Sequence, residues 1–243
     1  MIQNDAPGGP CGADTETRRH LRRRNLPRRL GDKRPGDYRY PGAAPCRAWR
    51  EHGRRGDGGP GPQGPARAAV TPTDFGDCFD CFQHSAFRLE TRQIYTIPAE
   101  LERIRAFRAG VPLPERSART SPWLARIQAT TRAGKRWQRI RLVAEPMTDY
   151  TRYQLAGYQE SAAAGEDIRI CRHAAHRDLA AHTRDFWLFD DLVAVFLHYD
   201  AEGRFARAEL TRDPPVITQC QAERDLALRH SMPLTRYLAL VTV

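Results

Sequence analysis

Apolar residues follow regular periods from about Asp74 to the end of the chain, and these periods predict a series of helices and strands. Phe75, Phe79 and Phe82 recur at about helical spacing, which predicts a short first helix. Residues 86–95 alternate between apolar and polar positions instead, as expected for a strand. A folded domain is therefore expected to begin with a helix and a strand.

Three further helices are predicted from start and stop signals. Pro98 suits the first position of a helix, and this helix should end at Gly110. The Ser-Pro pair at 121–122 repeats the start signal, and Gly134 supplies a stop. Thr148 is expected to cap a third helix, which carries three tyrosines at helical spacing.

The remaining apolar runs predict strands around these helices. Strands at 137–144 and 168–171 flank the third helix, and such a unit is long enough for a right-handed parallel crossover. Residues 185–210 predict a three-strand antiparallel meander, followed by a helix at 216–229 and an apolar run at 237–243. This order predicts an α+β or α/β single domain with a mixed sheet flanked by helices.

The N-terminal segment has a different composition. The first 70 residues contain 12 of the 18 glycines and 9 of the 18 prolines and almost no large apolar residue. Such a segment cannot bury enough surface to offset about 1–2 kcal/mol per residue of ordering entropy. We therefore predict a disordered basic tail over residues 1–72 and one globular domain over 73–243. The Arg-rich run at 18–29 is either an arm for nucleic acid or an acidic partner, or part of a misassigned start whose true position is Val70.

The charge lies mainly in this tail. The chain carries a net charge of +10, of which the first 70 residues, with 15 basic and 7 acidic residues, contribute +8. A nucleic-acid-binding fold would need a basic domain, so nucleic acid is expected to bind only through the tail, if at all. No run of eighteen apolar residues predicts a membrane span, and no secretory signal is recognisable at the N-terminus. A cytoplasmic location is therefore expected.

Two groups of residues have spacings known from metal sites. Cys78 and Cys81 match a zinc half-site or a redox pair, but no second C-x-x-C follows, and packed thiols on one helix face are the alternative. His173, His176 and His182 could hold a metal, or they could lie in a solvated polar loop. We predict no metal ligands, no cofactor and no catalytic residues.

Paired carboxylates occur at 166–167 and at 190–191. Such pairs act as acid, base or metal ligand in some hydrolases and phosphotransferases. Both pairs here fall at predicted strand ends or turns, where Asp also caps backbone groups. Both interpretations stay open.

The arginines and tyrosines of the crossover unit form the candidate ligand site. Arginines alternate along one predicted strand, another arginine lies on the strand beside it, and the intervening helix begins with Tyr and Arg. Ligands of open α/β sheets favour the crevice at the carboxyl ends of the strands, and Arg and Tyr donors suit a phosphorylated or nucleotide-like anion. The candidate ligand-binding residues are Arg139, Arg141, Tyr150, Arg152, Tyr153, Asp167 and Arg169. Surface Arg–Asp pairing over an aromatic core is the alternative.

Five motifs in order resemble the signature of an uncharacterised actinobacterial family of domains of unknown function. They are A-F-R-L-E at 86–90, P-M-T-D-Y-T-R-Y at 146–153, A-G-E-D-I-R-I at 164–170, D-F-W-L-F-D-D at 185–191 and H-Y-D-A-E-G-R-F at 198–205. The resemblance covers residues 75–234 and leaves the tail outside, and this sequence departs from the family pattern at C-F-D-C and in the His-rich segment. Family members tend to be encoded beside small helix-turn-helix regulators, which implies a regulatory setting. No catalytic residues are established for the family, so none is transferred.

The order of elements is also similar, at the level of fold alone, to phospholipase-D-like domains that have lost activity and serve as sensors. The active enzymes need His-x-Lys-x4-Asp, and no histidine here is followed two positions later by lysine. The first functional hypothesis is therefore a non-enzymatic regulatory or protein-interaction module that works with a helix-turn-helix regulator. The alternative is a sensor or enzyme that binds a phosphorylated or nucleotide-like anion in the Arg/Tyr crevice.

Overall fold

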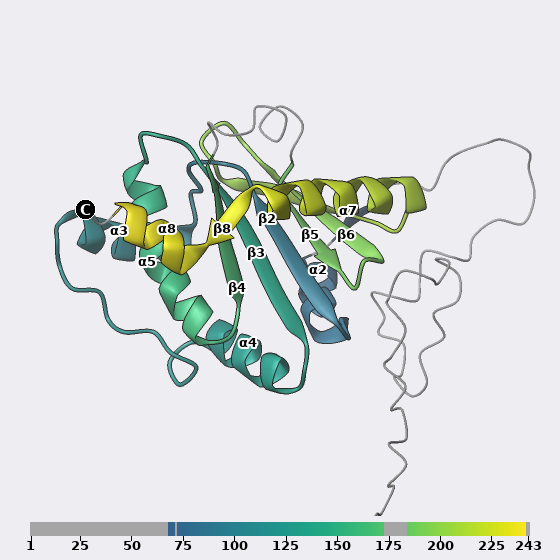
Figure 1. Ribbon diagram of the computed structural model, residues 1–243, viewed down its shortest axis with the longest axis horizontal. Coiled ribbons are helices and arrows are strands. Elements are labelled where there is room, and N and C mark those ends of the chain that lie inside the picture. The colour runs from purple at the N-terminus through teal and green to yellow at the C-terminus, as the bar shows by residue number, and fades with distance from the viewer. Residues whose placement is uncertain (1–67, 71, 173–183, 242–243) are drawn as a thin grey trace, which may run out of the picture. The chain divides into compact units, whose positions relative to one another are not determined.

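The computed structural model describes residues 68–70, 72–172 and 184–241. Nearly all of the predicted tail and the His-rich segment at 173–183 lie outside these residues. Within them, eight strands form one mixed sheet in the order β1-β7-β6-β5-β2-β3-β4-β8 (Figure 1). The strands are β1 Ala68–Val70, β2 Ser85–Glu90, β3 Arg136–Val143, β4 Asp167–Arg172, β5 Phe186–Phe189, β6 Val193–Tyr199, β7 Phe205–Thr211 and β8 Ser231–Pro233.

The sheet has a parallel centre and antiparallel flanks. Strands β2, β3 and β4 run parallel, whereas β5, β6, β7 and β1 continue antiparallel on one side and β8 on the other. The helices are α2 Pro72–Cys81, α3 Leu101–Arg108, α4 Pro122–Arg132, α5 Asp149–Ala163, α7 Pro214–Arg229 and α8 Leu234–Val241, with a 3-10 turn η1 at Pro98–Glu100. The predicted mixed sheet flanked by helices is confirmed, and α5 makes the predicted parallel crossover from β3 to β4.

Local capping explains where two of these helices begin. The Ser121 hydroxyl accepts from the backbone N–H of Leu124 at the start of α4, and Pro122 takes the first helical position. The Thr148 hydroxyl accepts from the N–H of Thr151 at 3.0 Å at the start of α5. Both starts follow the signals in the sequence.

Helices cover both faces of the sheet. Helices α2 and α4 pack one face through a cluster that contains Phe79, Leu124, Trp137 and Trp187. Helix α7 packs the other face, where Ile217 and Cys220 meet the apolar side chains of the central strands (Figure 1). Helices α5 and α8 complete the layer around β4. The central strands are therefore buried on both sides.

Two local features differ from the sequence prediction, and a third adds to it. Strand β2 ends at Glu90, five residues before the predicted end, because the chain leaves the sheet toward η1. The edge strands β1 and β8 have three residues each, too few to give a periodic signal. The last apolar run lies largely in helix α8, which buries Leu234 and Tyr237.

The carboxylate pair at 190–191 forms the turn between β5 and β6. Asp190 and Asp191 both have positive φ, as a tight hairpin requires. The Asp190 carboxylate accepts from the backbone N–H groups of Gln83, His84 and Ser85 at 2.7–2.8 Å. This carboxylate therefore caps the start of β2, as the turn interpretation expected.

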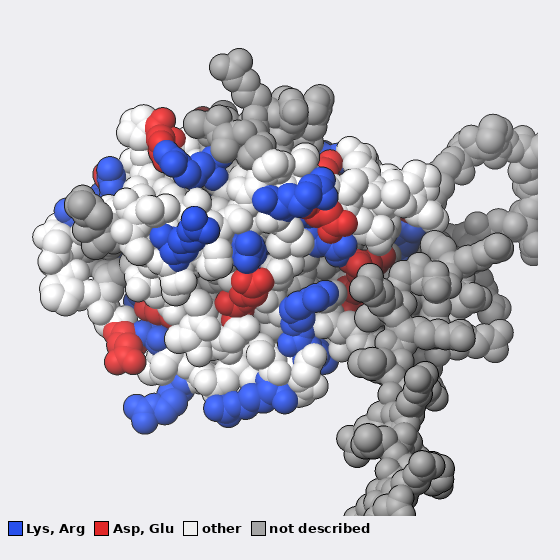
Figure 2. All heavy atoms as spheres, viewed as in Figure 1, with Lys and Arg blue, Asp and Glu red and all other residues white. Residues whose placement is uncertain are grey.

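One face of the described residues carries mixed charge (Figure 2). Figure 2 shows Lys and Arg scattered across one face with Asp and Glu among them. No helix in the described part of the chain is both long and apolar enough to cross a bilayer.

Gly203, in the turn between β6 and β7, is required by two constraints. It has a φ of +80°, and an added Cβ would lie 2.7 Å from the carbonyl oxygen of Ile94. Gly134 has a φ of +88° but open space around it. We expect Gly134→Ala to lower the free energy of unfolding by about 1 kcal/mol through backbone strain. Gly203→Ala should lower the free energy of unfolding by about 1–3 kcal/mol more than Gly134→Ala, because the added Cβ also clashes with the Ile94 carbonyl oxygen.

Urea denaturation of the two variants checks this difference. Equal destabilisation of the two variants would show that the contact between Gly203 and Ile94 does not constrain the turn.

Candidate functional site

A cluster of buried charges lies on the sheet face that packs against α2, α4 and α5. Charged residues alternate with apolar ones along β2 and β3, and because helices cover this face most of the charges are buried. The cluster contains three arginines and three carboxylates, so its formal charge is zero; its members are Arg88, Glu90, Arg139, Arg141, Glu166 and Asp185. Each is buried except Arg139, whose side chain is 11% exposed.

Glu90, the last residue of β2, is at the centre of this cluster. Its carboxylate accepts from Arg139 Nη1 at 2.5 Å and from the Tyr158 hydroxyl, and Arg88 Nε lies 3.5 Å away. Burial by itself would raise the pKa of Glu90, but Arg139, Arg88 and Arg141 outweigh it and lower the pKa from 4.5 to about 2. Glu90 is therefore held as a buried carboxylate.

Asp185 binds a second set of donors at the start of β5. Its carboxylate accepts from Arg88 Nη2 at 2.6 Å, from the Thr91 N–H and hydroxyl at 2.9 and 2.7 Å, and from the Tyr95 hydroxyl. Burial lowers the pKa of Arg88, but Asp185 and the other acidic groups raise it more, so the net pKa is raised. These contacts fix the loop that follows β2.

Arg141 is fully buried, and its three side-chain nitrogens form no hydrogen bond with the described residues. Its guanidinium lies 5.0 Å from the centre of the Tyr95 ring, and Nη1 is 4.0 Å from Glu90 Oε2. A cation–π contact and the nearby carboxylate therefore compensate its charge.

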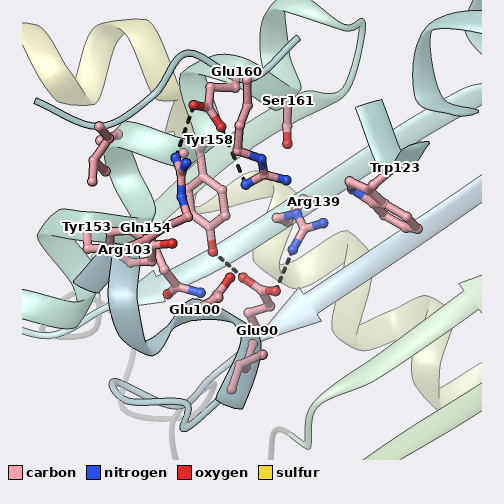
Figure 3. Close-up of a pocket in the computed structure, with 15 residues that line it drawn as sticks. Glu90, Glu100, Arg103, Trp123, Arg139, Tyr153, Gln154, Tyr158, Glu160 and Ser161 are labelled. Atoms are coloured by element: carbon pink, nitrogen blue, oxygen red, sulfur yellow. Dashed lines mark hydrogen bonds and ion pairs between the residues drawn. The ribbon is translucent and has the colours of Figure 1, made fainter. Parts of the chain in front are cut away.

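A cavity of about 270 Å³ opens beside this cluster, between the sheet and helices α3, α4 and α5. Figure 3 shows Glu90 joined to Tyr158 and Arg139 at one side of the cavity, with Trp123 beyond Arg139. Its polar and aromatic lining comprises Glu90, Glu100, Arg103, Arg116, Trp123, Arg139, Tyr153, Gln154, Tyr158, Glu160 and Ser161. The site thus offers charged donors, carboxylate acceptors and an aromatic wall.

Two carboxylates of the cavity have different environments. Glu100 accepts from the Tyr150 hydroxyl at 3.1 Å, and burial raises the pKa of Glu100 despite that bond and two nearby arginines. Glu160, on α5, forms ion pairs with Arg103 and Arg116. Arg139 bonds Glu90 at 2.5 Å and Glu166 at 2.8 Å, whereas Arg103 and Arg116 contact Glu160 only at 3.6 and 3.5 Å, so these two arginines retain more donor capacity for a ligand.

The structure brings some of the candidate residues together. Arg139 and Tyr153 line the cavity, and Arg141 is buried in the adjoining charge cluster. Tyr150 reaches the cavity through its bond to Glu100. The cavity lies between the sheet face and helices α3, α4 and α5, however, and not in a crevice beyond the strand ends as expected.

Three candidates lie elsewhere, which corrects the prediction of one shared crevice. The register pairs Arg139 with Ile168, so Asp167 and Arg169 project from the opposite face of the sheet. Arg169 donates there to Ser231, and Asp167 accepts from a glutamine of β3. Arg152 is exposed on α5 and pairs with the adjacent Asp149.

Sequence reasoning missed the acidic half of the site. Glu90, Glu166 and Asp185 were not assigned to it, and neither were Arg88 and Tyr158. A usable signal was present, because charges at alternate positions of central strands must be buried when helices cover both faces. Such charges need partners of opposite sign.

The residues with metal-site spacing do not form a metal centre in the described part of the chain, where no group of three or more His, Cys, Asp or Glu is placed to hold an ion. Cys78 is buried in the apolar cluster beneath α2. The predicted histidine group lies outside the described residues.

The depressed pKa of Glu90 generates a pH prediction. A group whose pKa is lowered by folding contributes stability above its unfolded pKa of about 4.5, and this contribution is lost as the pH falls toward 2. We expect Glu90→Gln to lower the free energy of unfolding by about 3 kcal/mol at pH 7 and to weaken its acid dependence.

Denaturation curves between pH 7 and pH 3 measure both effects. Glu102→Gln, at a side chain that is 85% exposed, is the matched control and should behave like the wild type. A Glu90→Gln variant with wild-type acid dependence would contradict the assigned role.

The chain has distant similarity to a number of solved structures, of which three are described. A phospholipase D family member, Nuc from Salmonella typhimurium, has a TM-score of 0.40 and 9% identity over 64% of this chain and 85% of that protein. NucT from Helicobacter pylori has a TM-score of 0.36 and 11% identity over 67% and 94%. Phosphatidylserine synthase from Haemophilus influenzae Rd KW20 has a TM-score of 0.38 and 13% identity over 66% and 36%.

These likenesses are too distant to assign a function to this chain. Among curated proteins, none matches the sequence. A family model does match, over residues 73–239, and it includes every element that contributes to the charge cluster and the cavity. The chain therefore belongs to the family described as domain of unknown function (DUF6879).

Proposed function

We propose that this domain is a regulatory sensor that binds a small phosphorylated or nucleotide-like ligand in the cavity between the sheet and helices α3, α4 and α5. The observation that carries the proposal is the combination of two cavity arginines, Arg103 and Arg116, with the aromatic wall of Trp123. Arginine binds phosphate oxygens in a bidentate manner, and an aromatic ring stacks on a flat base.

The buried charge cluster supports this proposal by giving the cavity a rigid floor. Arg139 is held by Glu90 at 2.5 Å and by Glu166 at 2.8 Å, and Tyr158 is held by Glu90. Side chains fixed in this way lose little entropy when a ligand binds. The cavity volume of about 270 Å³ is slightly below the usual range for drug-sized ligands, and suits a small metabolite.

The sensor proposal predicts thermal stabilisation of the full chain by a phosphorylated ligand. A ligand at a hundredfold its Kd adds about 2.7 kcal/mol, which raises the Tm of a domain of this size by about 5–10 °C. A panel of nucleotides and sugar phosphates, tested by thermal shift, should include at least one such ligand.

Arg116→Gln should abolish the thermal shift. Arg152→Gln, which removes the same charge from the exposed part of α5, should preserve it. A panel without a stabilising ligand, or a shift that survives Arg116→Gln, would count against the sensor proposal.

A second candidate function is interaction with a helix-turn-helix regulator, as family resemblance implies. The supporting observation is a pair of adjacent segments with exposed apolar side chains. The Thr96 N–H donates to the Gly203 carbonyl at 2.8 Å, which places the loop after β2 beside the β6–β7 turn. Ile94 and Phe205 on these segments are each 51% exposed. Exposed apolar side chains of this kind favour a protein partner.

This candidate predicts that the full chain co-purifies with a helix-turn-helix regulator from a lysate of its native host. The double variant Ile94→Asp and Phe205→Asp should lose the complex, because it places two charges in the apolar contact. Val111→Asp, at a similarly exposed position after α3, is the control and should retain it. Retention of the complex by the double variant would exclude this surface.

A further inference from the structure

Two arginines converge on one carboxylate at the edge of the cavity. Arg103, from α3, lies 3.6 Å from Glu160, and Arg116, from the loop that precedes α4, lies 3.5 Å from it. Figure 3 shows Glu160 with both contacts marked, on the α5 side of the cavity. The three side chains come from three separate elements, so the tertiary fold creates this arrangement.

The contacts are longer than those of a well-formed charged hydrogen bond. Arginine and carboxylate in such a bond approach to about 2.7–2.9 Å. Arg103 Nε and Glu160 Oε2 are both buried, yet neither has a hydrogen-bond partner among the described residues. Arg103 therefore retains a donor that Glu160 does not use, and the contact of Arg116 with Glu160 is long at 3.5 Å.

Each arginine is also held in place without Glu160. Arg103 Nη1 donates to the Pro114 carbonyl at 3.3 Å, and Arg116 Nη2 donates to the Ser121 hydroxyl at 3.3 Å. The Ser121 hydroxyl caps α4, which ties the position of Arg116 to that helix. The two guanidinium groups would thus stay oriented toward the cavity if the carboxylate moved away.

The charges at this point match a dianion. Arg103 and Arg116 together carry two positive charges and contact one carboxylate. Glu100 also lines the cavity, where burial raises its pKa and its carboxyl accepts from the Tyr150 hydroxyl rather than from either arginine. A phosphate monoester carries close to two negative charges near neutral pH and offers several acceptor oxygens in a geometry that arginine pairs bind well.

We propose that Arg103 and Arg116 form the phosphate subsite of this cavity and that Glu160 is the internal anion that a phosphate monoester displaces. This assignment rests on the proposed sensor function and deepens it. The side chain of Glu160 is 20% exposed and has a route to solvent. The organic part of the ligand then lies toward Trp123, which forms the aromatic part of the cavity wall.

Isothermal titration calorimetry of the full chain tests the subsite with adenosine 5′-monophosphate, inorganic phosphate and adenosine as probes. Glu160→Gln removes the competing charge and keeps the shape, so it should bind the monophosphate about fivefold more tightly than the wild type. Glu102→Gln removes an equal charge from an exposed position of α3 and should leave the affinity unchanged. The double variant Arg103→Gln and Arg116→Gln should bind none of the probes, and adenosine should bind no variant.

The outcomes separate this inference from the proposed function. Tighter binding of adenosine 5′-monophosphate by Glu160→Gln than by the wild type would support the subsite. If inorganic phosphate binds as tightly as the monophosphate, the subsite is supported with the free ion as its ligand. Unchanged affinity in Glu160→Gln, together with lost binding in the arginine variant, would overturn the displacement of Glu160 and leave the sensor proposal intact. If neither phosphate probe binds to the wild type or to Glu160→Gln, the subsite is overturned. The thermal-shift panel tests the sensor proposal independently of this result.

Discussion

The contact between Glu90 and the arginines around it constrains the rest of this domain. A carboxylate buried in the middle of a sheet is stable only when donors of opposite charge surround it. Arg139 from β3 and Arg88 from β2 supply these charges, and Tyr158 from α5 supplies a hydroxyl. One side chain thus joins two central strands to the crossover helix, in addition to the apolar contacts that α5 makes with β3 and β4.

The cavity exists because the charge cluster interrupts an apolar layer. Beside it, Phe79 packs against Trp123, Trp137 and Trp187 with ring centroids 4.9–5.9 Å apart, which closes the space under α2 and α4. Where Arg139 and Glu90 replace apolar side chains on the same face, α5 presents tyrosine and glutamate instead of leucine. The polar part of the sheet therefore faces a polar cavity and the aromatic part faces a packed core.

Most elements of the fold could be predicted because their signals are local. The caps at Ser121 and Thr148, the prolines at helix starts and the alternation in β2 and β3 depend on neighbours in the sequence. Strand β8 could not be predicted, because it is three residues long and exists only through pairing with β4. The end of β2 at Glu90 was also not predictable, since the chain there turns to let Tyr95 donate to Asp185.

The sequence by itself determined the mixed sheet, the crossover from β3 to β4 and the presence of Arg139, Arg141 and Tyr153 in one unit. Membership of DUF6879 also follows from the sequence. Only the tertiary structure decided which charges meet. The register of β4 against β3 sends Arg169 to the far face, whereas Glu90, Glu166 and Asp185 approach the arginines from three distant segments. Pairing between buried charges depends on the relative placement of whole elements, and no local pattern of residues encodes that placement.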